Sequence, residues 1–146
     1  MFKKIFILVV TMTTPLFAEH EVWIEQALQA QSLAYCPYSN YRVGVALITT
    51  DGEVIQGCNI ENASYGLTIC AERTAACAAL SQGKQNFKAI VVATRDGGTP
   101  CGACRQFLNE FNPQMTVITV NEKGKVTHQT TLDKLLPNAF GPHNLE

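Results

Sequence analysis

A chain of 146 residues is long enough for one domain with its own core, and its composition of 47% hydrophobic and 16% charged residues excludes disorder over most of its length. The formal net charge is −1, and the eleven basic residues are scattered, with no run longer than Lys3-Lys4. A surface that follows a nucleic-acid backbone needs clustered positive charge, so we expect no nucleic-acid partner.

The N-terminal segment resembles the start of a signal peptide, because Lys3-Lys4 precedes the apolar run Ile5–Val10. The run is too short for a transmembrane helix, so we expect no stable membrane span. The cues for export conflict, since Thr and Pro interrupt the apolar stretch and a start at Met12 would leave most of it untranslated. We therefore expect an N-terminal extension, 1–18, before one domain over 19–146. A cytoplasmic location is favoured, and export stays open.

Hydrophobic periodicity and turn residues predict nine elements after this extension. In chain order they are helix Glu21–Ala34, strand Val43–Ile48, strand Val54–Ile55, a helix from about Cys70, strand Lys88–Ala93, helix Gly102–Phe111, strand Met115–Val120, strand Val126–Gln129 and helix Leu132–Leu136.

The order of these elements, α-β-β-α-β-α-β-β-α, predicts an α/β fold. Strands joined through helices are expected to run parallel, and the hairpin signal Asp51-Gly52 adds an antiparallel pair. We expect a three-layer α/β/α sandwich with a mixed five-stranded sheet.

Three cysteines indicate a metal site. Cys70 lies 31 residues before Cys101, and Cys104 follows in a C-x-x-C spacing. Cys70 and the C-x-x-C pair each stand at the start of a predicted helix, where free N–H groups and the helix dipole favour thiolate over thiol. Three converging thiolates would form a tetrahedral zinc site with one position open, which predicts one zinc ion per chain.

Two other uses of a C-x-x-C pair fit this sequence less well. A structural zinc site needs a second pair of ligands, and Cys70 has no Cys or His at short spacing. A redox pair would not need a third cysteine beside a glutamate. The whole string C-x-E…P-C-x-x-C matches the signature of zinc deaminases, with Cys in place of the first His.

The two residues after Ala71 have both a chemical and an ordinary interpretation. Glu72 beside an open metal position can take a proton from water and give it to a leaving group, or it can simply stabilise the first turn of a helix. Arg73 can donate to a thiolate and offset the net negative charge of a three-thiolate zinc site, or it can be a solvated helix residue.

With these residues in place, the chain from about Trp23 to about Phe140 resembles the small homotetrameric cytidine deaminases. Four motifs carry the resemblance, namely Cys-Ala-Glu-Arg-Thr-Ala at 70–75, Pro-Cys-Gly-Ala-Cys-Arg-Gln at 100–106, Gly-Cys-Asn-Ile-Glu-Asn at 57–62 and Leu-Leu-Pro-Asn-Ala-Phe at 135–140. The resemblance implies a zinc-dependent hydrolase of pyrimidine salvage. Its substrates would be free cytidine and deoxycytidine and its products uridine and deoxyuridine.

The resemblance also implies substrate contacts. Asn59 and Glu61 match a pair that binds the ribose, and the backbone of Ala71 matches a contact to the pyrimidine amide edge. Tyr41 stands where the family usually has a Phe that packs on the base, so its hydroxyl is a departure. Phe140 matches an aromatic residue that reaches the site of a neighbouring subunit.

Two rival functions remain at this point. The substrate could be another aminopyrimidine nucleoside, such as a nucleoside antibiotic, or a nucleotide, although the carboxylate of Glu61 would repel a phosphate. The chain could instead be a non-enzymatic binding module that zinc stabilises.

Overall fold

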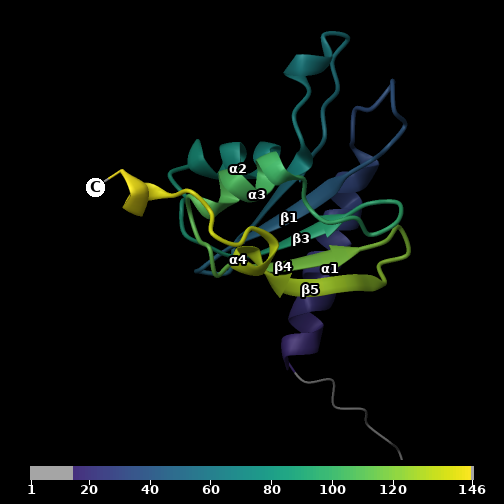
Figure 1. Ribbon diagram of the computed structural model, residues 1–146. Helices are drawn as coiled ribbons and strands as arrows, with labels where there is room; N and C mark the ends of the chain where they lie inside the picture. Colours follow the sequence, from purple (N-terminus) through teal and green to yellow (C-terminus); the bar gives the residue numbers. More distant parts are fainter. Residues whose placement is uncertain (1–14, 146) are drawn as a thin grey trace, which may run out of the picture.

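The computed structural model describes residues 15–145, in which helices cover both faces of one mixed sheet (Figure 1). The elements are α1 (Pro15–Ser32), β1 (Gly44–Thr49), β2 (Val54–Cys58), the 3₁₀ turn η1 (Tyr65–Leu67), α2 (Ala71–Leu80), β3 (Phe87–Ala93), α3 (Gly102–Asn109), β4 (Thr116–Val120), β5 (Val126–Thr131), α4 (Leu132–Leu135) and the 3₁₀ turn η2 (Pro142–Asn144). The predicted order of helices and strands is confirmed.

The sheet has the strand order β2-β1-β3-β4-β5. Only β3 and β4, which flank α3, are parallel neighbours; β1 pairs antiparallel with both β2 and β3, and β4 pairs antiparallel with β5. The strands β2 and β3, which flank α2, also run in the same direction, as expected for strands on either side of a helix. They are not neighbours, because β1 lies between them. The mixed five-stranded sheet is confirmed.

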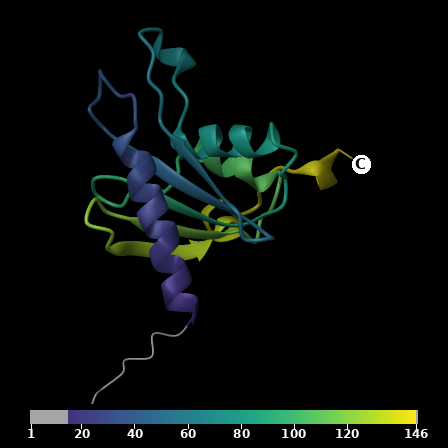
Figure 2. The ribbon, with the colours of Figure 1, turned by 180° about the vertical axis from the view of Figure 1, so that it is seen from behind.

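Two hydrophobic cores lie on opposite faces of this sheet. On one face α1 packs through Trp23 and Ala27 against Ala46, Ile48 and neighbouring residues of β3 and β4. Figure 2 shows α1 crossing that face alone. The other face carries α2, α3 and α4. Because β1 and β3 are covered on both faces, their side chains form nearly continuous apolar runs, as buried central strands require.

Two glycines let the helices approach the sheet closely. A Cβ atom on Gly57 of β2 would lie 2.5 Å from the backbone nitrogen of Ala75 in α2, and one on Gly44 of β1 would lie 2.1 Å from the backbone nitrogen of Gln31 in α1. Real carbon contacts are about 3.5–4.0 Å, so any side chain there would push a helix off the sheet.

The two ends of α1 differ from the prediction. The helix begins at Pro15, where proline is well tolerated in a first turn, and ends at Ser32 instead of Ala34. The helix ends early because the residues after it pair with another segment: the N–H of Tyr35 donates to the carbonyl of Asn59 at 3.1 Å.

Most of the predicted N-terminal extension, 1–14, lies outside the described residues. Within 15–145, no helix combines the length and the hydrophobicity that a bilayer crossing requires.

The carboxyl ends of β2 and β3 and the start of β1 meet at one edge of the sheet, where the helix starts of α2 and α3 also lie (Figure 1). Ligand sites of open α/β sheets form outside the carboxyl ends of strands. The sequence motifs at 57–62, 70–75 and 100–106 are all brought to this edge.

Candidate active site

The predicted metal ligands meet at the starts of two helices. Cys70 caps α2 and Cys101 caps α3, both with extended backbone, and Cys104 lies in the first turn of α3. Their three sulfur atoms all lie within 4.8 Å of one another, and the Cys70 and Cys101 sulfurs are 4.0 Å apart. A tetrahedral zinc ion with Zn–S bonds of about 2.3 Å separates its sulfurs by about 3.8 Å, so the three thiols fit zinc.

The electrostatics of the cluster favour an ionised thiol. Hydrogen bonding from Cys104, Arg73 and Cys101 lowers the pKa of Cys70 to about 5, and the same pairing with Cys70 raises the pKa of Cys104. Nη2 of Arg73 lies 3.6 Å from the Cys70 sulfur. The guanidinium is therefore placed to offset the negative charge that three thiolates would bring to a divalent ion.

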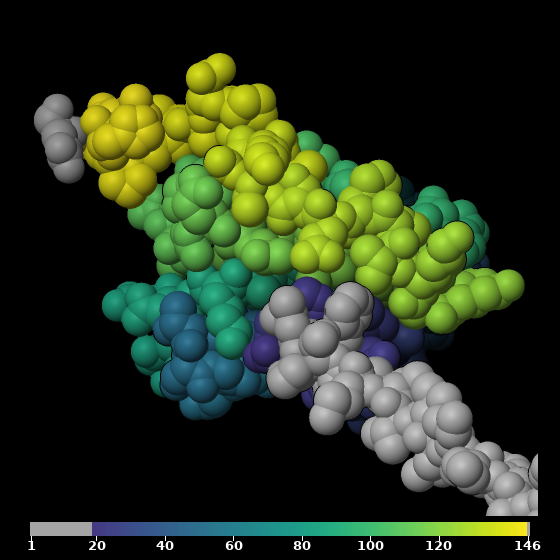
Figure 3. Space-filling model, turned by 90° about the horizontal axis from the view of Figure 1, so that it is seen from below, coloured from purple at the N-terminus to yellow at the C-terminus, as the bar shows by residue number. Residues whose placement is uncertain are grey.

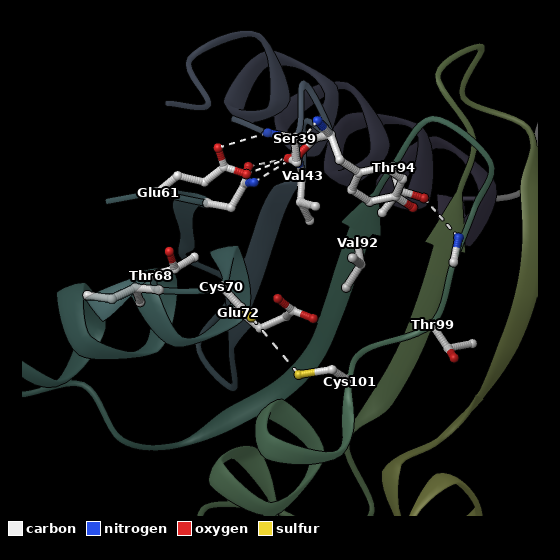
Figure 4. A pocket seen from close by; sticks show the side chains of 14 residues that line it. Ser39, Val43, Glu61, Thr68, Cys70, Glu72, Val92, Thr94, Thr99 and Cys101 are labelled. Atoms are coloured by element: carbon white, nitrogen blue, oxygen red, sulfur yellow. Dashed lines mark hydrogen bonds between the residues drawn. The ribbon is translucent and has the colours of Figure 1, made fainter. Parts of the chain in front are cut away.

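Glu72 points into a cavity of about 380 Å³ that Cys70 and Cys101 also line (Figure 4). Glu72 is the second residue of α2 and is only 4% exposed. This burial raises the pKa of its carboxyl above the ordinary value. The cavity size falls within the range of roughly 300–1,000 Å³ that is usual for small-molecule sites. A buried carboxylate beside a metal site can accept and return a proton inside this cavity.

Asn59 and Glu61 line the same cavity, and the side chains of both already form hydrogen bonds with backbone groups. Oδ1 of Asn59 accepts from the N–H of Val43 at 2.9 Å, and its Nδ2 donates to the carbonyl of Tyr41 at 2.8 Å. Each of these atoms has capacity for one further hydrogen bond, so a ligand hydroxyl could still bind there.

The carboxylate of Glu61 accepts from the backbone N–H groups of Tyr38 and Ser39, at 2.8 and 3.2 Å, and from the Ser39 hydroxyl. These bonds, that of the Ser39 hydroxyl first, hold the pKa of Glu61 below its usual range. The carboxylate therefore stays ionised at the rim that faces Glu72 across the cavity (Figure 4).

Tyr41 also lines the cavity, and the structure gives its hydroxyl a partner that sequence reasoning missed. It donates to Asp96 at 2.6 Å, and Thr94 donates to the same carboxylate oxygen at 3.2 Å. Thr94 and Thr99 line the cavity too. The sequence marks Asp96-Gly97-Gly98 only as a loop, because neither periodicity nor spacing indicates which side chain such a loop will meet.

Two residues named from the sequence do not line the cavity. Ala71 is fully buried at the first position of α2. Phe140 is 57% exposed in the C-terminal segment, and only its backbone carbonyl is held, by a bond of 2.9 Å from Gln106. The structure of one chain thus leaves the ring of Phe140 outside its own site.

Comparison with known proteins decides the family. Residues 18–120 match the model of the cytidine and deoxycytidylate deaminase zinc-binding region. The chain belongs to this family. It is 48% identical over 128 residues to a cytidine deaminase of Sporosarcina psychrophila, a match that covers 86% of this chain and 93% of that one. A probable cytidine deaminase of Dictyostelium discoideum is 47% identical, and the match covers 87% of this chain and 87% of that one.

The fold is shared as well. The crystal structure of a cytidine deaminase from Burkholderia pseudomallei superposes with a TM-score of 0.79 at 48% identity, covering 83% of this chain and 98% of that one. The chain is therefore a hydrolytic deaminase, and its metal is zinc, for which Cys70, Cys101 and Cys104 are correctly placed.

Proposed function

We propose that the protein converts cytidine and deoxycytidine, with water, to uridine and deoxyuridine and ammonia. The observation that carries this proposal is one cavity with two chemically different ends. Glu72, Cys70 and Cys101 form one end, with the buried sulfur of Cys104 next to the other two sulfurs, and Asn59 and Glu61 form the other end. A base placed at the metal end directs its sugar toward an amide and a carboxylate, which suit hydroxyl groups.

Glu72 moves the protons of the reaction. Bound zinc supplies a Lewis acid that makes water acidic near neutral pH. The Glu72 carboxylate takes a proton from the attacking water and delivers it to N3 of the pyrimidine as the bond to C4 forms. It then passes the second proton of the water to the amino group, which departs as ammonia while the C4 carbonyl forms. Burial of Glu72 keeps bulk water from competing for these protons.

The sugar end selects an unphosphorylated substrate. The Glu61 carboxylate accepts from a sugar hydroxyl, and its negative charge disfavours a phosphate group nearby. The ring of Tyr41, which lines the cavity, contacts the base. Arg73 positions the metal through Cys70 without touching the substrate.

The active assembly is a homotetramer in which Phe140 of one subunit reaches the cavity of another. Figure 3 shows the C-terminal segment extending away from the body of the molecule at one corner. Phe140 is exposed there. Beside the cavity, Tyr38 and Tyr65 are exposed as well, and their rings pack edge to face with centroids 5.7 Å apart. Large exposed aromatic groups of this kind favour association with further copies.

The reaction takes place in the cytoplasm. A site of three reduced thiolates is best maintained in a reducing compartment. Fractionation of cells that express the full chain tests this point, and recovery of the protein outside the cytoplasm would contradict it.

A substrate panel tests the proposed function. Purified protein is assayed by ultraviolet absorbance with cytidine, deoxycytidine, cytosine and dCMP, and its zinc content is measured in the same sample. We expect turnover of the two nucleosides, little or none of cytosine and dCMP, and about one zinc per chain. Preferential turnover of dCMP would move the substrate to nucleotides. No turnover of any aminopyrimidine by zinc-loaded protein would favour a binding module.

A further inference from the structure

The loop 94–99, which runs from β3 to the metal ligand Cys101, is fixed from two sides. On the inside, Oγ1 of Thr94 accepts from the N–H groups of Gly97 and Gly98, both at 2.8 Å. On the outside, Thr127 of β5 donates to the carbonyl of Gly97 at 2.9 Å. Gly97 has a φ of +79°, and a Cβ atom there would lie 2.3 Å from Thr127, so the loop admits no side chain at this point.

Asp96 reaches from this loop to a different wall of the cavity. Its Oδ1 accepts from the hydroxyl of Tyr41 at 2.6 Å and from that of Thr94 at 3.2 Å. The hydrogen bonds use the single hydroxyl proton of each donor. Arg95 lies over the Tyr41 ring, with Cζ 5.5 Å from its centroid. A Cβ atom on Gly98 would lie 3.4 Å from the Tyr41 hydroxyl oxygen, so the hydroxyl is in close contact with the loop backbone.

Tyr41 is consequently held at both ends. Its backbone carbonyl accepts from Asn59 at 2.8 Å, and its side chain is bound by Asp96. Tyr41 and Asn59 line the cavity together with Thr94 and Gly98, whereas Asp96 does not. Asp96 is thus an exposed residue outside the cavity lining, in contact with a residue that belongs to it.

We propose that Asp96 is a positioning residue for the substrate, which fixes the ring of Tyr41 in the cavity wall by accepting its hydroxyl hydrogen bond. The inference rests on the proposed function, because it assigns the ring to the nucleoside base. Through this bond the chain joins the ring to the loop that leads to Cys101. The pair acts on the affinity for the nucleoside and leaves the metal and Glu72 unchanged.

The protonation states support the direction of this hydrogen bond. The Tyr41 hydroxyl holds the pKa of Asp96 below its usual range, while burial, and next the bond to Asp96, raises the pKa of Tyr41. The carboxylate is therefore the acceptor and the phenol the donor throughout the neutral range.

The test compares Tyr41→Phe, Asp96→Ala, Asp96→Asn and the double variant Tyr41→Phe/Asp96→Ala with wild type. Asp51→Asn is the matched control, because Asp51 is also an exposed carboxylate that accepts from a hydroxyl in a turn, that of Thr49, and it does not line the cavity. The readouts are KM and kcat for cytidine, the Kd for uridine by calorimetry, and zinc content.

We expect Tyr41→Phe and Asp96→Ala each to raise KM and the uridine Kd by about three- to tenfold, the usual effect of one hydrogen bond, with kcat within about twofold. The double variant should be no worse than the more impaired single variant, because both changes remove one interaction. Asp96→Asn keeps an acceptor oxygen and should recover much of the affinity. The control and all zinc contents should match wild type.

Multiplied effects in the double variant would overturn the proposal, and so would a fall in kcat with unchanged KM or a loss of zinc in Asp96→Ala. Failure of wild-type protein to turn over cytidine would refute the proposed function instead. The uridine affinities of the variants would then decide the positioning role on their own.

Discussion

Replacing Glu72 by Gln separates the chemistry of the site from its structure. The side chain is 4% exposed, and the amide has nearly the same size and shape as the carboxylate, so packing around it is kept. Volume-conserving changes in a core usually cost less than about 1.5 kcal/mol. In a chain of this length that corresponds to a change in Tm of at most about 6 °C.

The effect on turnover should be much larger. An amide cannot accept the proton of the attacking water, and general acid–base catalysis contributes about 10²–10⁴-fold, which equals about 2.7–5.4 kcal/mol in the barrier. We therefore expect kcat for cytidine to fall by at least about 100-fold. Zinc content should stay near one per chain, because the three sulfurs alone form the ligand cluster.

The measurements are kcat and KM by ultraviolet assay, metal content and Tm. Glu110→Gln serves as the control, since Glu110 is exposed at the far end of α3 and does not line the cavity. Near-normal turnover in Glu72→Gln would remove Glu72 from the mechanism. A loss of zinc along with turnover would show that the carboxylate acts mainly in holding the metal.

Four further predictions follow from the site and its supports. Cys101→Ala should lose zinc and activity together, as metal analysis of the purified variant will show. Arg73→Gln should keep zinc but lower kcat by about 10–100-fold, the usual range for partners of metal ligands. Gly57→Ala should push α2 away from the sheet at a cost of about 1–3 kcal/mol, visible as a lower Tm in thermal melts. Truncation before Phe140 should raise KM and reduce the assembly below a tetramer in light scattering, whereas a fully active monomer of the intact chain would rule out shared sites.

The sequence was sufficient for those parts of the site that depend on local spacing. Cys70 and Glu72 occupy the cap and second position of one helix, and Cys101 and Cys104 occupy the cap and third position of another, so the relative positions within each pair follow from helix geometry. The element order could be read for the same reason, because each helix or strand has its own hydrophobic period.

What the sequence could not provide depends on contacts between loops. The bond from Tyr41 to Asp96 joins residues 55 positions apart, and that from Ser39 to Glu61 joins residues 22 apart. Irregular backbone has no period from which such pairs could be inferred. The hairpin signal predicts that β1 pairs with β2, but which of these two strands also pairs with β3 is set by packing across the sheet and by no local signal.

The structural role of Asn59 constrains how the proposed sugar end of the cavity could be redesigned. Its side chain is 8% exposed and joins the chain at Val43 to the chain at Tyr41. An alanine there would leave a half-buried N–H and a half-buried carbonyl without these partners, so loss of activity in that variant would say little about sugar recognition. Engineering of selectivity should therefore start from Thr68 at the cavity wall, whose side chain is half-buried, and keep the amide at position 59 in every library.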